Sequence, residues 1–304
     1  MRIGLALPNY GRDAGLRAMV EVSRSAEDMG YDSLWTGDRL LAPLAPQDAY
    51  PGGGVMPSAY RLHMDPLVSL AFATAHTNRV RIGTSTLNAL WQPPLVLARQ
   101  LTTLDVLSGG RLDIGIGLGW LRDEYQSVNV PWKGRGARLE ETLDLLETYW
   151  TAEVMAHEGN LFEVPPATVD LRPVQRPRPP VLLAAFSSEG LRRVARRADG
   201  WLPVAMPLDV LMNLWGIVER EARDAGRDPA ALRMALRVNL QLTDEPVTQE
   251  EVPFRGTFQQ YVDYARAAAE AGVHELFLDP GQTHLSLAER IDLAGRFLEG
   301  VRRG

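Results

Sequence analysis

The segment Val80–Trp120, VRIGTSTLNALWQPPLVLARQLTTLDVLSGGRLDIGIGLGW, contains the patterns that decide the fold. It opens with an apolar strand pattern at Val80–Ser85 and ends with another at Arg111–Gly117. Between them, Pro93–Leu107 has apolar residues at helical spacing, and a proline suits the first turn of a helix. A strand, a helix and a second strand in this order predict a βαβ unit with parallel strands.

The same alternation of strand and helix runs through the rest of the chain. Further strand patterns cover Arg2–Leu7, Asp32–Thr36, Val181–Ala185, Gly200–Val204, Arg233–Leu242 and Val273–Leu278. Further helical patterns cover Leu16–Met29, Asp65–His76, Gly134–Trp150, Ser188–Ala198, Leu208–Ala225, Thr257–Glu270 and Leu285–Val301. Eight strand–helix units predict an α/β fold, a (β/α)8 or TIM barrel, as a single domain over residues 1–304. A doubly wound open sheet is the alternative, but no GxGxxG motif follows the first strand.

Two long segments fit none of these units. They are Leu40–Met64, rich in proline, glycine and tyrosine, and Glu153–Arg178, in which Glu158–Phe162 and Asp170 suggest a small hairpin. Loops of this length in a compact domain are commonly functional. We therefore expect both to lie at the active-site face of the barrel and to determine the substrate.

Composition limits the functional classes. The chain has no cysteine and a formal net charge of −6, so disulfides and thiol catalysis are excluded and a nucleic-acid partner is disfavoured. No apolar run reaches the ~18 residues of a membrane span. The start, MRIGLALPNY, lacks the apolar core of a signal peptide. We expect a cytoplasmic protein, away from membranes, that acts on a small molecule.

In a TIM barrel the active site lies where the strands end. The residues there are Pro8, Asn9, Gly37, Asp38, Arg39, Thr84, Ser85, Thr86, Gly117, Leu118, Gly119, Trp120, Ala184, Ala185, Phe186, Ser187, Asn239 and Gln241. This set has no histidine–carboxylate pair, no cluster of metal ligands and no nucleophile beside a base. We therefore predict no metal site, and a pocket for a flat cofactor that carries the chemistry itself.

Three smaller features each have two interpretations. Ser187 and Ser188 precede the basic helix LRRVARR, so they hold a phosphate or simply cap the helix. GIGLGW departs from a dinucleotide fingerprint, so it is read as a strand end that another backbone approaches closely. Among the histidines, His63 is the one placed to reach the barrel mouth. Four aromatic residues either line a pocket or fill the core: Tyr50, Tyr60, Trp91 and Trp132.

Taken together, these segments resemble the luciferase-like monooxygenase superfamily of flavin- and deazaflavin-dependent oxidoreductases. The matching segments run in the family's order from about Arg2 to Pro203: GLALPNYG, AEDMGYDSLWTGDRL, the stretch from TNRVRIGTS to GIGLGW, RDEY, RGARLEETLDLLETYW and PPVLLAAFSSEGLRRVARRADGWLP. The resemblance implies a TIM barrel with one cofactor at its C-terminal face, and a homodimer.

The resemblance also implies the positions of the cofactor contacts. The ring is expected against a bulge at Thr84–Thr86 with a cis peptide at Ser85–Thr86, and the phosphate at Ser187 and Ser188. Asp38, Ala184 and Ala185 would flank the ring, with Trp120 nearby. The full set of expected cofactor-binding residues is Asp38, Thr84, Ser85, Thr86, Gly117, Gly119, Trp120, Ala184, Ala185, Ser187 and Ser188.

The GTS bulge, GxGxGW and RGxRLEE most resemble the branch that uses coenzyme F420, a deazaflavin. Arg39, Pro43 and Trp120 stand where the sugar-phosphate dehydrogenases of that branch carry His, Trp and Glu, which argues against that activity. The expected function is F420-dependent hydride transfer to or from a small organic substrate. The alternatives are an FMN-dependent monooxygenase that uses oxygen and a non-catalytic flavin-binding barrel. The catalytic candidates are Asp38, Arg39, His63 and Trp120.

Overall fold

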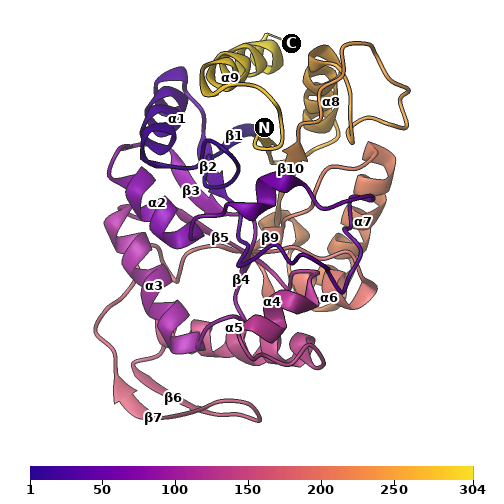
Figure 1. The fold of residues 1–304 in the computed structure, drawn as a ribbon. Helices are drawn as coiled ribbons and strands as arrows, with labels where there is room; N and C mark the ends of the chain where they lie inside the picture. The colour runs from indigo at the N-terminus through magenta and orange to yellow at the C-terminus, as the bar shows by residue number, and fades with distance from the viewer. Residues whose placement is uncertain (304) are drawn as a thin grey trace.

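Eight parallel strands close into a barrel in the computed structural model, which describes residues 1–303 (Figure 1). The strands are β1 (Arg2–Ala6), β2 (Ser33–Thr36), β3 (Arg81–Thr84), β5 (Leu112–Gly117), β8 (Val181–Leu183), β9 (Gly200–Trp201), β10 (Arg233–Asn239) and β11 (Glu275–Asp279). Their order is β3, β2, β1, β11, β10, β9, β8, β5, and a pairing between β3 and β5 completes the ring. The predicted (β/α)8 barrel is confirmed.

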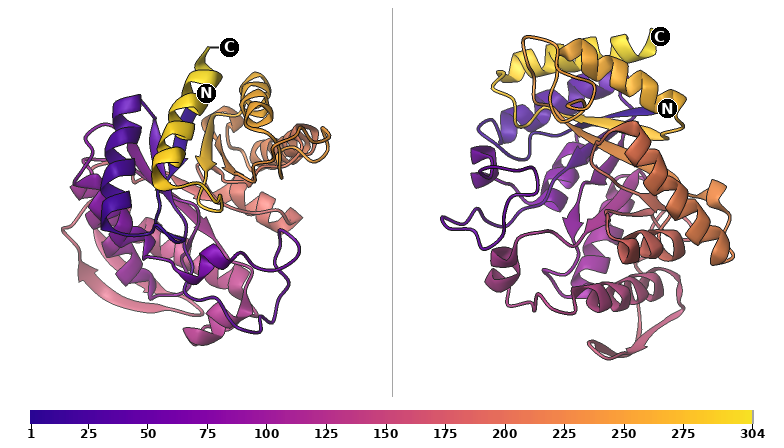
Figure 2. Two further views of the ribbon diagram at one scale, coloured as in Figure 1. Left: turned by 45° about the horizontal axis from the view of Figure 1, so that its top comes forward. Right: turned by 90° about the vertical axis from the view of Figure 1, so that its right-hand side faces the viewer.

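A helix follows each barrel strand, and the helices form the outer ring in Figures 1 and 2. They are α1 (Leu16–Met29), α2 (Pro66–Thr74), α3 (Pro94–Leu107), α5 (Arg135–Thr151), α6 (Ser188–Arg197), α7 (Leu208–Asp224), α8 (Phe258–Glu270) and α9 (Leu287–Arg302). Gly30 ends α1 with a φ of 92°, and Thr257 and Ser286 form capping boxes at the starts of α8 and α9. None of these helices, within residues 1–303, combines the length and apolar character needed to cross a membrane.

Some elements differ from the predicted pattern. The predicted hairpin exists, but its strands are β6 (Val154–Glu158) and β7 (Glu163–Thr168), so Glu158–Phe162 is mostly the turn and Asp170 lies outside the strands. The hairpin projects beyond α3 and α5 in Figure 1, so this part of the long second segment is not at the active-site face. The elements that were not predicted are a short strand β4 (Leu87–Asn88), a helix α4 (Arg122–Ser127) and two 3-10 turns at Ser58–Arg61 and Pro229–Ala231.

The inside of the barrel is filled by side chains. Trp35, Leu182, Leu202, Ala235 and Phe277 form this interior cluster, and each is at most 2% exposed. The rings of Trp35 and Phe277 stack with their centroids 4.7 Å apart. Because the interior is packed, a ligand has room only at an end of the barrel.

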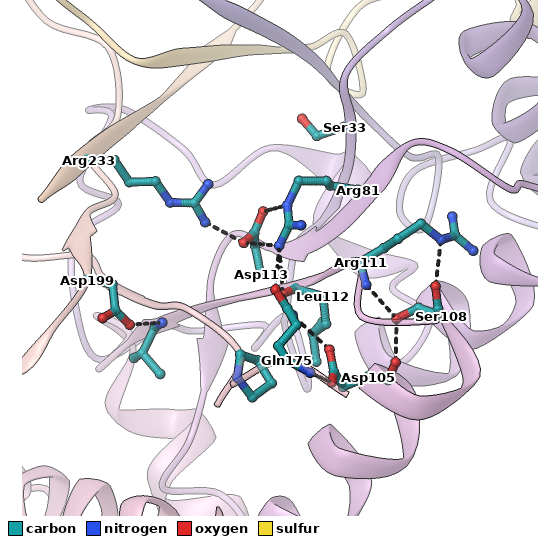
Figure 3. Close-up of polar contacts among 12 residues, drawn as sticks. Ser33, Arg81, Asp105, Ser108, Arg111, Leu112, Asp113, Gln175, Asp199 and Arg233 are labelled. Atoms are coloured by element: carbon teal, nitrogen blue, oxygen red, sulfur yellow. Dashed lines mark hydrogen bonds and ion pairs between the residues drawn. The ribbon is translucent and has the colours of Figure 1, made fainter. Parts of the chain in front are cut away.

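A charged network covers the amino-terminal end of the barrel (Figure 3). The fully buried carboxylate of Asp113 accepts two hydrogen bonds of 2.7 Å from Arg81 and forms an ion pair with Arg233. The side chain of Gln175 accepts a hydrogen bond from Arg81 at 3.2 Å and donates one to Asp105 at 2.7 Å. The network joins β3, β5, β10 and α3, and its position opposite the candidate site assigns it to stability.

Candidate active site

The third barrel strand is interrupted by a bulge. Ile82 pairs with Leu112 before the interruption, and Leu87 pairs with Ile116 after it. The chain thus advances five residues on one strand against four on the other, which is the extra residue of a β-bulge. The Ser85–Thr86 peptide inside the bulge is cis. Both the predicted bulge and the predicted cis peptide are confirmed.

Two glycines of β5 make room for the bulge. The hydroxyl of Thr84 donates to the carbonyl of Gly115 at 2.8 Å and accepts from its N–H at 3.0 Å. A Cβ on Gly115 would lie 1.9 Å from the Thr84 carbonyl oxygen, and a Cβ on Gly117 would lie 2.5 Å from the Thr86 hydroxyl. Gly115 is therefore needed for close backbone approach, as the sequence indicated, and Gly117 leaves space for the Thr86 side chain.

A partly buried arginine that the sequence analysis missed supports the bulge from the barrel side. The Nη1 group of Arg237 donates to the carbonyl of Ser85 at 2.5 Å, and its Nε donates to Asn239 at 2.9 Å. Its Nη2 group pairs with Asp279, whose other oxygen accepts from the Tyr10 hydroxyl at 2.8 Å. Burial lowers the pKa of Arg237, but Asp279, Tyr10 and Tyr60 together outweigh burial and raise that pKa above its ordinary value. The sequence signal was an arginine inside the apolar strand RMALRVN.

Two pockets meet at the bulge. The outer pocket has a volume of about 440 Å³ and the inner pocket about 190 Å³. Both are lined by Tyr60, Ser85, Thr86, Trp120 and Arg237. The outer pocket extends over the ends of β8, β9 and β10 and is lined further by Tyr50, Ala184, Phe186, Leu202, Pro203, Val204, Ala205, Asn239, Gln241, Pro253, Phe254 and Gln282. The inner pocket extends over the ends of β2 and β5 and is lined further by Gly37, Asp38, Arg39, His63, Asn88, Trp91, Gly119 and Glu124.

Arg39 forms one wall of the inner pocket. Its guanidinium lies 5.0 Å from the ring centroids of both Tyr60 and Trp120, which is cation–π contact distance. Its Nη1 group is 3.4 Å from the carboxylate of Glu124, a residue of the unpredicted helix α4. Glu124 also accepts a hydrogen bond of 2.9 Å from the N–H of Leu40. The position after Asp38 therefore holds a cation that lies between two aromatic rings and pairs with Glu124.

Two titratable groups of the inner pocket, the Asp38 carboxyl and the His63 imidazole, have pKa values shifted in opposite directions. Burial, opposed by a 3.0 Å hydrogen bond from the Asn88 N–H, raises the pKa of the Asp38 carboxyl to about 7. Burial, reinforced by the charges of Arg39 and Arg237, lowers the pKa of His63 to about 4. The His63 ring stacks on Tyr10 at 4.9 Å. At neutral pH the pocket thus presents a carboxyl group near its titration midpoint beside a neutral imidazole.

Replacing Asp38 by asparagine is expected to change how stability depends on pH. The raised pKa means that the folded chain binds this proton more tightly than the unfolded chain. The stabilisation is therefore present below about pH 4 and lost as the pH rises through 7. Asparagine keeps an oxygen for the Asn88 N–H but does not titrate. Between pH 5 and pH 8 the Asp38→Asn variant should gain about 2 kcal/mol in unfolding free energy relative to wild type. Urea unfolding at both pH values measures this, and a pH-independent difference would contradict it.

The predicted phosphate segment is exposed at the start of α6. The hydroxyl of Ser187 caps the helix by accepting from the Gly190 N–H at 3.2 Å, and Ser188 begins the helix. Arg193 and Arg197 both pair with Glu140 of α5. These arginines thus face neighbouring helices, and an anion at this point would depend on the serine hydroxyls and the first backbone amides.

The predicted site residues separate into two groups. Those that line one or both pockets are Asp38, Arg39, His63, Ser85, Thr86, Gly119, Trp120 and Ala184. Those that line neither pocket are Thr84, Gly117, Ala185, Ser187 and Ser188. Of the aromatic candidates, Trp132 lies elsewhere, packed edge-on against Tyr125 and under Arg135. Within residues 1–303 no three His, Asp or Glu side chains are grouped to hold a metal ion.

The barrel, the bulge and the pockets at the carboxyl ends of the strands define a TIM-barrel enzyme class. A family model described as luciferase-like monooxygenase matches residues 1–277, and the chain belongs to this family. An uncharacterised protein of Mycobacterium tuberculosis is 32% identical over 231 residues, which cover 73% of this chain and 80% of that protein.

Solved structures of two functional types share the fold. An F420-dependent secondary alcohol dehydrogenase, solved with an F420–acetone adduct, has a TM-score of 0.80 at 17% identity and covers 99% of both chains. A type II Baeyer–Villiger monooxygenase, the oxygenating part of 3,6-diketocamphane monooxygenase of Pseudomonas putida with FMN, has a TM-score of 0.78 at 16% identity, covering 99% and 98%. At these identities the likeness concerns the fold.

Proposed function

We propose that this chain is an oxidoreductase that uses coenzyme F420 to move a hydride to or from a small organic substrate. The observation that carries the proposal is the meeting of two pockets at the β3–β4 bulge, one large enough for a ring cofactor and one small and polar. The GTS bulge and the GxGxGW strand end, which resemble the deazaflavin branch, support F420 over FMN. The proposed setting is the cytoplasm, and the proposed assembly is a homodimer.

The outer pocket fits a flat ring. Its volume of about 440 Å³ lies in the range of ~300–1,000 Å³ typical of small-molecule sites. Phe186, Leu202 and Pro203 supply apolar walls, which suit the faces of a ring, while Asn239 and Gln241 supply amide groups, which suit its polar edge. The residues present are therefore compatible with either a deazaflavin or a flavin.

The proposed roles of the chain's own residues follow from this placement. A bound ring cofactor supplies the hydride chemistry. Ser85 and Thr86 would support it, and Trp120 and Tyr60 would exclude water where the two pockets meet. Asp38 would hold or release a proton at Oδ1, because Oδ2 accepts the Asn88 N–H. Its pKa of about 7 suits proton exchange at neutral pH.

Anaerobic titration with F420 and with FMN, followed by fluorescence quenching, tests the proposal. We expect F420 to bind at least about tenfold more tightly, which corresponds to ~1.4 kcal/mol. Tighter binding of FMN, coupled to oxygen consumption after reduction, would contradict the choice of F420 and favour the monooxygenase. If neither cofactor bound, the oxidoreductase proposal itself would fail.

A substitution at Ser187 locates the phosphate. Aspartate is as good a helix cap as serine, so Ser187→Asp should leave α6 intact while adding a negative charge at its start. We expect about tenfold weaker binding of F420 and FMN, which carry phosphate, and unchanged binding of riboflavin, which does not. Ser187→Thr keeps the hydroxyl without the charge and is the control. Equal effects on FMN and riboflavin would contradict this placement.

A further inference from the structure

In the ion pair between Arg237 and Asp279, the arginine lies on the side of the two pockets and the aspartate lies on the far side. Arg237 lines both the outer and the inner pocket. Asp279 lines neither of them and lies behind the guanidinium, where it accepts hydrogen bonds from Tyr10 at 2.8 Å and from the Gly281 N–H at 2.9 Å. The positive end of the pair therefore faces the place where the pockets meet.

The guanidinium is also fixed in position. Its three nitrogens bind three different acceptors: the Ser85 carbonyl, the Asn239 side chain and the Asp279 carboxylate. Tyr10 in turn holds the second oxygen of Asp279. Because the guanidinium is already held in place, it does not have to move when the charge of a neighbouring ligand changes. Such preorganisation is the condition for effective electrostatic stabilisation.

We propose that Arg237 stabilises the reduced form of the bound ring cofactor relative to the oxidised form, and that Asp279 limits this effect. The proposal rests on the proposed function, because it requires a ring cofactor in the outer pocket. A hydride brings two electrons and one proton, so its addition gives a flavin or deazaflavin ring one more unit of negative charge. A nearby cation that is largely shielded from water therefore favours the reduced form.

A purely structural role makes a different prediction. If Arg237 only supported the Ser85 carbonyl, its loss would weaken binding of the oxidised and reduced forms by the same factor. Arg233 provides the matched comparison, since it lies on the same strand with the same 18% side-chain exposure and also pairs with a buried carboxylate, Asp113. Arg233 lies at the opposite end of the barrel and lines neither pocket.

The test measures the dissociation constants of oxidised and chemically reduced cofactor under anaerobic conditions, for whichever of F420 and FMN the wild type binds. Arg237→Met should weaken the reduced form about tenfold more than the oxidised form, which lowers the two-electron potential of the bound cofactor by about 30 mV. Asp279→Asn should shift the ratio of the reduced to the oxidised dissociation constant in the opposite direction. It removes the counter-charge of Arg237 and keeps an oxygen for Tyr10. Arg233→Met should lower the melting temperature and leave the ratio unchanged.

Each outcome is decisive. Opposite shifts in the Arg237→Met and Asp279→Asn variants support the proposal, and Asp279→Asn alone decides it if Arg237→Met fails to fold. Equal weakening of both redox forms, or a shift of the same size in Arg233→Met, overturns it while leaving the proposed function intact. If the wild type bound neither cofactor, the proposed function itself would fail. That result differs from a wild type that binds a cofactor while the variants leave the ratio of the reduced and oxidised dissociation constants unchanged.

Discussion

Replacing the fully buried Asp113 by asparagine should lower the free energy of unfolding by about 3–5 kcal/mol, because it leaves two partly buried arginines without their counter-charge. Asp113 is fully buried and serves both Arg81 and Arg233 (Figure 3). Burial raises the pKa of this carboxyl, but the hydrogen bonds and charges of the two arginines outweigh burial and lower it. Its stabilisation is therefore present at neutral pH and lost as the pH falls through the depressed pKa.

Urea unfolding at pH 7 measures the Asp113 effect. The control is Glu21→Gln at the exposed pair Arg17–Glu21, which has a 2.6 Å separation and should change stability by less than about 0.5 kcal/mol. Since the network lies opposite the pockets, cofactor affinity of the folded variant should stay at the wild-type value. A loss below about 1 kcal/mol would show that the two arginines find other partners or water, contrary to the expected burial penalty.

Replacing Gly115 by alanine is the second change with a large expected effect. The added Cβ would lie 1.9 Å from the carbonyl oxygen of Thr84, which is backbone and has no rotamer to adopt. The bulge must move, so we expect a loss of about 3 kcal/mol in unfolding free energy. Because the displaced residues line both pockets, cofactor binding in the folded fraction should weaken at least about tenfold.

Gly216→Ala is the matched control for this substitution. Gly216 lies in α7, and a Cβ there would meet nothing within 4 Å. Alanine should stabilise the helix by up to about 1 kcal/mol and leave cofactor binding unchanged. Wild-type cofactor affinity in the Gly115→Ala variant would contradict the assignment of the bulge as the support for the ring.

The repeating strand–helix pattern could be predicted from the sequence because it depends on interactions between residues that are close together in the chain. Helix α1 has the predicted limits, Leu16–Met29, since its apolar spacing and the terminal Gly30 are local signals. The bulge at Thr84–Thr86 and the cis peptide were predicted from the resemblance, and they carry a local signature of small residues. The short strand β4 and the helix α4 were missed because they are too brief for a hydrophobic period to develop.

The sequence analysis missed other residues for a different reason: their contacts join segments that are far apart in the chain. Arg237 contacts Ser85, which is 152 residues earlier in the chain, and Asp113 contacts Arg233, which is 120 residues later. An arginine within an apolar strand shows that a buried partner must exist, but not which acid supplies it. Likewise, the pKa of Asp38 depends on burial by residues distant in the sequence.

By itself, the sequence determined the barrel, the family and the face that carries the pockets, because periodicity, caps and the order of motifs are properties of neighbouring residues. Only the tertiary structure decided that the site has two compartments, that Arg237 stands between them and that Asp38 titrates near neutrality. These properties arise when closure of the barrel brings the ends of separate strands together. Pocket volume, burial and ion-pair orientation are set by that closure and have no counterpart in any local segment.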